Sequence, residues 1–307
     1  MTAHPPPPES LRRTLTHQVV VLDGGLSTVL ADLGCDLSSD LWTAAALRDS
    51  PERVVAAHRA YFAAGAQVAT TASYQASVEG FEALGMTRTE AADLVRRSIM
   101  LARRARDEHA AGWVAASVGP YGATLADGSE YRGGYDVSPA TLRDFHARRL
   151  DVLAAAEPDV LAVETVPDVR EAEVLVPLLD DLGMDAWFSY AVADGRTRAG
   201  QPLEEAFAVV AGSRSIVAAG VNCSAPGEVL GALTAVRSAG IDAGVAYPNQ
   251  GRAWDSESHT WTGRATFDPD LVGSWIDAGA RLVGGCCQVG PTGIAALAAR
   301  VASTQAR

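Results

Sequence analysis

The sequence contains no lysine, so its 25 Lys and Arg residues are all arginines. That absence excludes Schiff-base catalysis, pyridoxal phosphate held on a lysine, and the phosphate-binding lysine of a Walker A loop. The chain also lacks the G-x-S-x-G pattern of the α/β-hydrolase nucleophile and the G-x-G-x-x-G pattern of dinucleotide-binding loops. Its chemistry must therefore rest on other side chains.

Long apolar runs are also missing, since no segment approaches the roughly 18–20 residues that cross a bilayer. The N-terminus, MTAHPPPPES, has no apolar core of the kind found in signal peptides. We therefore expect a cytoplasmic protein with a disordered, proline-rich tail over residues 1–15. The net charge of −12 disfavours nucleic acid and anionic membranes as partners. No assembly arm is evident, which favours a monomer.

Cysteine is scarce, with four residues in a chain of 307, yet two of the four are adjacent in the segment RLVGGCCQVG (281–290). Four cysteines in a chain of this length do not make a disulfide framework. In a reducing compartment, clustered cysteines more often indicate metal binding or catalysis.

Eight short, β-rich apolar runs alternate with longer Ala-, Leu- and Arg-rich stretches of helical periodicity. Helix-start signals precede two of these stretches, Ser50 before Pro51 and Ser138 before Pro139. Alternating strands and helices predict an α/β fold of right-handed βαβ units. Eight units predict a single (β/α)8 TIM barrel over residues 16–307, with a doubly wound open sheet as the alternative. The predicted strands are 19–25, 66–73, 112–120, 160–166, 186–192, 216–224, 243–250 and 280–288.

Polar and reactive residues gather at the predicted C-terminal ends of these strands. A barrel enzyme places its active site there, whereas the opposite ends are mostly Ala and Val. The residues at the C-terminal ends include Asp23, Thr70, Tyr74, Glu164, Asn222, Cys223, Cys286 and Cys287.

Three cysteines end the sixth and eighth runs and can converge at one barrel mouth. Three thiolates with one open position suit a catalytic Zn²⁺. Neighbouring strand residues point to opposite faces, so Cys286 and Cys287 can share a metal only where the strand ends and the backbone turns. We expect Gly284 and Gly285 to ease that turn. A redox disulfide between the adjacent pair, or inert packing, are the alternatives.

None of the six histidines falls at a predicted strand end, although a zinc hydrolase usually recruits histidine or carboxylate ligands. An all-thiolate zinc site activates water weakly but lowers the pKa of a bound thiol and leaves it nucleophilic. The pattern therefore indicates thiol chemistry. The negative charge of the site favours a cationic electrophile such as a sulfonium methyl donor.

Several segments resemble the homocysteine S-methyltransferases, above all the short bacterial and plant type that uses S-methylmethionine or S-adenosylmethionine. They run in the family's order and are VVLDGGLST, TTASYQAS, VGPYGATLADGSEYRG, AVETVPDVREAE, GVNCSAP, YPNQG and VGGCCQVGP. The resemblance implies a (β/α)8 barrel with zinc held by Cys223, Cys286 and Cys287. It also implies methyl transfer to the thiol of L-homocysteine, which gives methionine.

The resemblance further implies that Asp23 and Glu164 bind the homocysteine ammonium, and Asn222 is expected to add a hydrogen bond. On the donor side, Trp42 occupies a loop similar to the one that contacts the donor cation in betaine-using relatives, and Tyr74 lies at the mouth. The Gly-rich segment 121–135 is typical of an active-site lid; an exposed loop without that role is the alternative.

Other functions stay open at this point. A betaine-homocysteine or selenocysteine methyltransferase would share the same fold and metal site. A non-catalytic zinc or redox protein could use the adjacent cysteines alone, but it would leave Asp23, Glu164 and Asn222 without a role.

Overall fold

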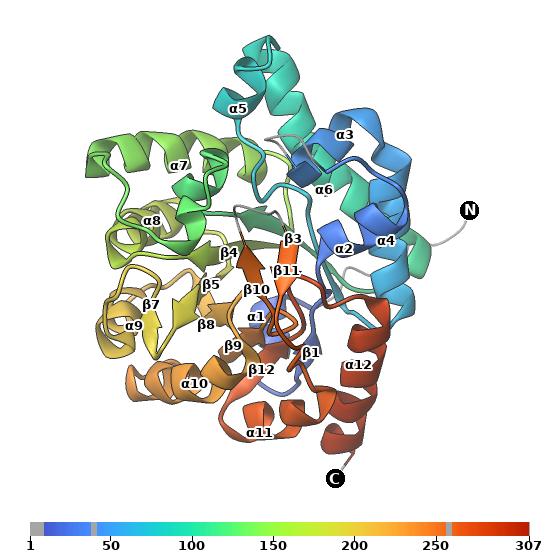
Figure 1. Cartoon of the computed structure of the whole chain (residues 1–307), viewed down its shortest axis with the longest axis vertical. Coiled ribbons are helices and arrows are strands. Elements are labelled where there is room, and N and C mark those ends of the chain that lie inside the picture. Colours follow the sequence, from blue (N-terminus) through green and yellow to red (C-terminus); the bar gives the residue numbers. More distant parts are fainter. Residues whose placement is uncertain (1–8, 38–41, 256–259, 307) are drawn as a thin grey trace.

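The computed structural model describes residues 9–37, 42–255 and 260–306. Its centre is a sheet of eight parallel strands in the order β1-β12-β9-β8-β5-β4-β3-β2 (Figure 1). All eight predicted runs contain one of these strands, and the (β/α)8 barrel is confirmed. The strands are β1 (Val20–Val21), β2 (Val68–Thr70), β3 (Trp113–Val118), β4 (Val160–Val166), β5 (Ala186–Tyr190), β8 (Ile216–Asn222), β9 (Gly244–Tyr247) and β12 (Ala280–Val283).

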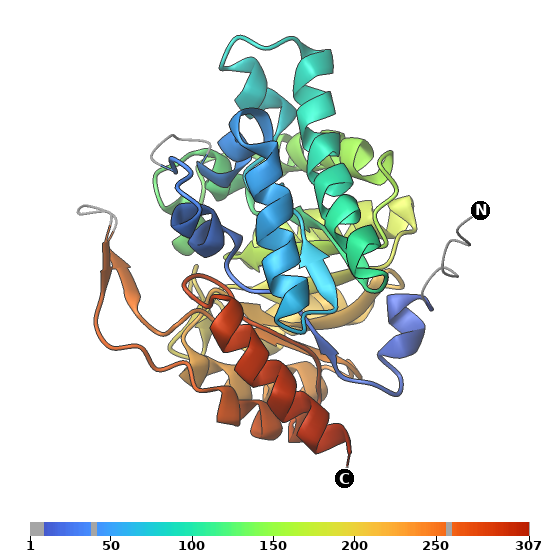
Figure 2. The same cartoon turned by 90° about the vertical axis from the view of Figure 1, so that its right-hand side faces the viewer.

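Helices surround the barrel and occupy the connections between its strands (Figures 1 and 2). In the described residues no helix is both long and apolar enough to cross a bilayer. The longer helices are α4 (Pro51–Ala63), α6 (Arg88–His109), α7 (Pro139–Ala154), α8 (Val169–Leu182), α9 (Leu203–Ala211), α10 (Val229–Ser238) and α12 (Pro291–Gln305). The shorter ones are α1 (Leu11–Thr14), α2 (Leu26–Asp32), α3 (Ala45–Asp49), α5 (Val78–Glu82) and α11 (Val272–Asp277).

The predicted helix starts are confirmed at α4 and α7, each of which begins with proline after serine. At α7 the Ser138 side chain accepts a hydrogen bond from the backbone N–H of Thr141 and caps the helix.

The loops contain smaller elements. Two are the hairpins β6 (Val192–Ala193)–β7 (Arg196–Thr197) and β10 (Ala253–Asp255)–β11 (Thr260–Thr262). The others are the 3₁₀ turns η1 (Trp42–Ala44), η2 (Tyr121–Thr124), η3 (Ser129–Tyr131), η4 (Pro226–Glu228) and η5 (Pro269–Leu271).

A glutamine joins the first and last strands of this order, β1 and β2. The Gln67 backbone N–H donates to the Val21 carbonyl at 2.7 Å. The Gln67 side-chain carbonyl accepts from the Val21 N–H at 3.0 Å. One residue thus connects the two strands of the nearly closed barrel through its backbone and its side chain.

Side chains alternate between the inside and the outside of the barrel, as the period of a strand requires. Val20 and Leu22 belong to an inner cluster with Trp187 and Leu282. Val21 instead belongs to the larger cluster between the strands and the helices. The barrel is therefore a packed core on both faces of its sheet, and open space for chemistry is left to its ends.

The expected boundary at residue 16 needs correction, because residues before it already form a helix that packs against the barrel. Residues 1–8 of the expected tail lie outside the described residues, but Leu11–Thr14 form α1. Leu11 and Leu15 are buried in the inner cluster. Arg12 reaches Asp185 and the carbonyls of Arg214 and Ser215, which precede β5 and β8. This helix covers the N-terminal ends of the strands and leaves the opposite end free for a site.

Candidate active site

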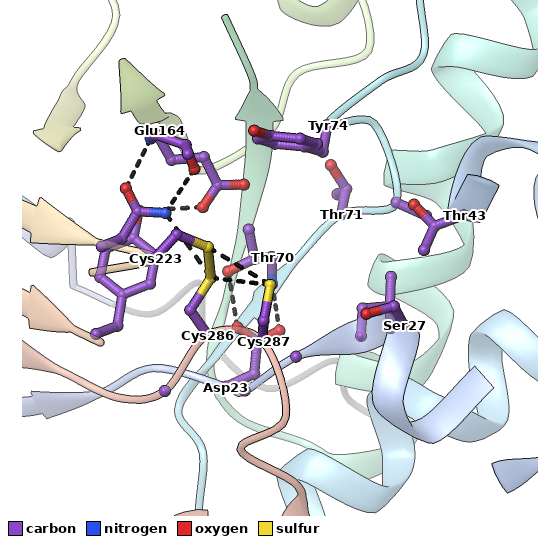
Figure 3. A pocket seen from close by; sticks show the side chains of 18 of the residues that line it. Asp23, Ser27, Thr43, Thr70, Thr71, Tyr74, Glu164, Cys223, Cys286 and Cys287 are labelled. Carbon is purple, nitrogen blue, oxygen red and sulfur yellow. Dashed lines mark hydrogen bonds between the residues drawn. A yellow bond between two sulfur atoms is a disulfide. The ribbon is translucent and has the colours of Figure 1, made fainter. Parts of the chain in front are cut away.

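A pocket at the C-terminal ends of the strands gathers the predicted site residues (Figure 3). Its walls come mainly from the C-terminal ends of β2, β4, β8 and β9 and from the segments that follow β1, β2, β8 and β12. We call it the thiol pocket. Among its lining residues are Asp23, Thr70, Tyr74, Glu164, Asn222, Cys223, Cys286 and Cys287.

The three cysteines converge as predicted, with their Sγ atoms all within 4.8 Å of one another. Cys223 and Cys286 form a disulfide. Cys287 is a free thiol whose Sγ lies 3.6 Å from that of Cys223 and 4.0 Å from that of Cys286. The disulfide therefore does not join the adjacent cysteines, which corrects that alternative.

These separations fit a tetrahedral metal site. Two thiolates bound to one Zn²⁺ at about 2.3 Å lie about 3.8 Å apart. The two distances from Cys287 bracket that value. The donor set is entirely sulfur, which soft metals such as Zn²⁺ prefer. The residues present therefore fit a zinc ion once the Cys223–Cys286 disulfide is reduced.

Backbone geometry turns the thiols toward one another. Cys223, directly after β8, adopts a φ of 45°, a left-handed conformation that is uncommon outside glycine. Beyond β12, the Cys286 carbonyl accepts from the Val289 N–H at 3.0 Å and closes a tight turn that contains Cys287. This turn brings adjacent cysteines to one side, as the metal hypothesis required.

The glycines before that turn have a different role from the one expected, because neither adopts a positive φ. A Cβ on Gly284 would lie 2.7 Å from the Leu22 Cβ and 2.8 Å from the Asp23 carbonyl. Close packing against the end of β1, and not backbone freedom, requires glycine there.

Asp23 follows β1 and is 4% exposed. Its carboxylate accepts from the Thr70 backbone N–H at 2.7 Å and from the Thr70 hydroxyl at 2.8 Å. Burial raises its pKa to about 8; the Thr70 hydrogen bonds oppose that rise, and the charge of Glu164 adds to it. Asp23 thus sits in a position that favours a cation beside it.

Glu164, on β4, is held by two hydroxyl groups. Ser117 donates to one carboxylate oxygen, and Tyr247 donates to the other at 3.0 Å. Trp187 in turn donates from its indole nitrogen to the Tyr247 oxygen at 2.9 Å. Burial raises the Glu164 pKa, while these hydrogen bonds and the positive charge of Arg149 lower it. The network fixes the direction of the carboxylate and supports its ionised form.

We expect Tyr247→Phe to raise the KM for an ammonium-bearing substrate about tenfold, because Glu164 loses a donor that favours its charged form. Steady-state kinetics measures the change. Tyr190→Phe is the matched control, since that buried tyrosine donates to the Ala206 carbonyl instead. Equal KM changes in both variants would contradict the role given to Tyr247.

Asn222 connects the carboxylate side of the pocket to the thiols. Its side-chain oxygen accepts from the Thr165 N–H at 2.6 Å, and its amide nitrogen donates to the Thr165 hydroxyl at 2.7 Å. The same nitrogen lies 3.9 Å from the Cys286 Sγ. Asn222 therefore fixes the end of β4 beside the cysteines.

The structure describes some of the residues expected to contact the methyl donor and not others. Tyr74 faces the pocket, and its buried hydroxyl has no hydrogen-bond partner in the part of the chain that the structure describes. The backbone of Trp42 begins η1, but its side chain lies outside what the structure describes. The proposed lid contributes Tyr131 to the pocket wall.

Four residues of the site had no assigned role in the sequence. Thr70 and Tyr247 fall at predicted strand ends, so position alone could have suggested them. Ser117 lies inside β3 and belongs to no pattern that indicates function. Tyr131 ends η3, within the segment 121–135 that the sequence marks as a candidate lid, but that pattern does not single it out. Their roles emerge only from the contacts.

The chain matches the family model described as homocysteine S-methyltransferase over residues 20–301. Homocysteine S-methyltransferase of Escherichia coli K12 is 41% identical over 303 residues, which cover 94% of this chain and 98% of that protein. Crystal structures of the homocysteine methyltransferase MmuM from Escherichia coli also match at 40% identity, each covering 95% of this chain and 100% of its own. The TM-score is 0.85 for its metallated form and 0.86 for its oxidized form.

Proposed function

The chain belongs to the homocysteine S-methyltransferase family, and on that premise we propose that this methyltransferase moves a methyl group from S-methylmethionine to the sulfur of L-homocysteine. The product is methionine. We propose that Cys223, Cys286 and Cys287 hold a zinc ion, and that Asp23 and Glu164 bind the homocysteine ammonium.

One observation carries the proposal: three thiols and two buried carboxylates share one pocket. Homocysteine carries a matching pair of groups, a thiol at one end and an ammonium at the other. The negative charge of Glu164 contributes to the raised pKa of Asp23, so a positive charge beside Asp23 would offset that repulsion. An ammonium between them satisfies both.

Zinc bound by the three thiolates would lower the pKa of the substrate thiol while leaving its sulfur nucleophilic. The residues around it position the substrate. Thr70 orients Asp23, and Ser117 and Tyr247 orient Glu164, so the two carboxylates hold the ammonium in the pocket that the thiols also line. Asn222 holds the end of β4 in register with the cysteines.

The transfer balances without a general acid. The thiol proton of homocysteine passes to solvent. The sulfur electron pair then forms a bond to the methyl carbon, while the carbon–sulfur bond of the sulfonium breaks and its pair stays on the leaving sulfur. The leaving group is a neutral thioether, so it needs no proton. The protein contributes alignment and electrostatics.

The test is methionine formation by the reduced protein loaded with zinc, supplied with homocysteine and S-methylmethionine. We expect turnover that stops with a chelator and returns with added zinc. S-adenosylmethionine and betaine serve as competing donors, and selenocysteine as a competing acceptor, in parallel assays. Full turnover in metal-free protein would contradict the zinc assignment, and a preference for betaine would contradict the donor assignment.

A further inference from the structure

A second cavity, of about 430 Å³, opens beside the thiol pocket. Its walls come from η3 and its flanks, from the β6–β7 hairpin, and from the segments after β8 and β9. Two residues, Tyr131 and Cys223, line both spaces. Cys223 can therefore be approached from two sides, and the second side has no occupant in the proposed homocysteine arrangement.

Three arginines line this second space, which we call the arginine cavity: Arg132, Arg198 and Arg252. They come from three separate loops of a chain whose net charge is −12. Arg132 pairs with Asp127 at 3.4 Å. Of the other two, neither forms an ion pair with any residue in the described ranges.

Arg198 is held in place through its Nε and its guanidinium plane, which leaves its two terminal nitrogens available to a ligand. Its Nε donates to the Tyr131 carbonyl at 2.9 Å, and its guanidinium lies 5.7 Å from the centre of the Tyr131 ring. These contacts fix the plane of the group and use one of its five N–H donors. The two terminal NH₂ groups of the guanidinium remain, and such a pair binds a carboxylate through two parallel hydrogen bonds.

One carboxylate also lines the cavity. Glu228 accepts from the backbone N–H groups of Asp194 and Gly195, both at 3.0 Å. Those two bonds fix the position of the carboxylate and leave lone pairs free for a further donor. The cavity thus presents guanidinium groups together with one anchored carboxylate, which is the complement of an α-amino acid zwitterion.

We propose that the arginine cavity binds the amino-acid end of the methyl donor. Arg198 and Arg252 take its α-carboxylate, Glu228 takes its ammonium, and its sulfonium points past Tyr131 toward Cys223. This inference rests on the proposed methyl transfer and deepens it by assigning the donor subsite. Opposite charges meet at both ends, since the sulfonium cation faces thiolates and the carboxylate faces arginines.

The test compares two donors in two enzymes. One donor is S-methylmethionine, and the other is its decarboxylated analogue, (3-aminopropyl)dimethylsulfonium. We expect Arg198→Met to raise the KM for S-methylmethionine about tenfold and to leave the KM for homocysteine unchanged. With the analogue, which has no carboxylate to lose, wild type and variant should have the same KM. Arg252→Met supplies an independent variant on another loop, with the same expectation.

Arg196→Met is the matched control, because Arg196 lies on the same hairpin but donates to the Gly200 carbonyl. It should behave as wild type with both donors. Equal losses with both donors, or a raised KM for homocysteine in the Arg198 variant, would overturn the subsite. If instead the wild-type protein forms no methionine from any donor, the proposed function itself fails, so the two failures are distinguishable.

Discussion

Replacing Cys287 by alanine is expected to abolish zinc binding and to lower kcat/KM for methyl transfer on the order of 1000-fold. The Cys287 sulfur lies within 4.0 Å of both other sulfurs, and two thiolates alone do not complete the site. Metal content measured after reduction and zinc loading, together with methionine formation, checks both parts. The thermal midpoint should change little, since a single small side chain is shortened.

Cys35→Ala provides the matched control for that experiment. Cys35 is the other free cysteine, half-buried against the core and outside the thiol pocket. It should keep wild-type zinc content and turnover. A Cys287→Ala protein with one zinc per chain and full turnover would show that the metal site has been assigned to the wrong residues.

Replacing Asp23 by asparagine is expected to raise the KM for homocysteine about 100-fold, because the ammonium loses a buried charged partner. The asparagine can keep both Thr70 contacts, with its oxygen accepting from the N–H and its amide donating to the hydroxyl. The rise in KM should therefore come from the lost negative charge, because the position of the side chain is kept. Kinetics with homocysteine varied at saturating donor measures it.

The same substitution should not destabilise the protein at alkaline pH. Asp23 has a pKa near 8 in the folded protein against an ordinary value of 3.8, so folding binds a proton between those limits. The contribution of Asp23 to the free energy of unfolding therefore falls as the pH rises from about 4 to 8, because the buried carboxyl must ionise at the upper end of that range. Asparagine carries no such cost. Thermal melts at pH 6 and pH 9 check this. The thermal midpoint of the variant relative to that of the wild type should be higher at pH 9 than at pH 6. The same difference in midpoint at both pH values would contradict the raised pKa.

The barrel and most of the thiol pocket could be predicted because they follow from short-range patterns. Nearly every strand end is marked by a polar residue after an apolar run, and parallel strands bring such ends together. Asp23, Glu164 and Cys223 needed no more than that rule. The pairing of Cys223 with Cys286 could not be predicted in this way, because it depends on how two loops turn after leaving the sheet.

The arginine cavity was beyond sequence reasoning for a related reason. Arg132, Arg198 and Arg252 are each exposed, and an exposed arginine alone is usually a solvated surface residue. Only the fold brings three of them to one space. Similarly, Gln67 gives no sign in the sequence that it connects β1 to β2, since its role needs both strands in place.

The position of α1 bears on how the chain folds during synthesis. Leu11 and Arg12 are synthesised long before the residues that precede β8, yet Arg12 contacts the carbonyls of Arg214 and Ser215 there. Val20 of β1 pairs with Leu282 of β12. The segments α1 and β1 therefore lack these partners until β8 and β12 have been synthesised, and the inner face of β1 stays exposed until then. Such long sequence separation favours slow folding and a need for protection from aggregation until the final strand emerges.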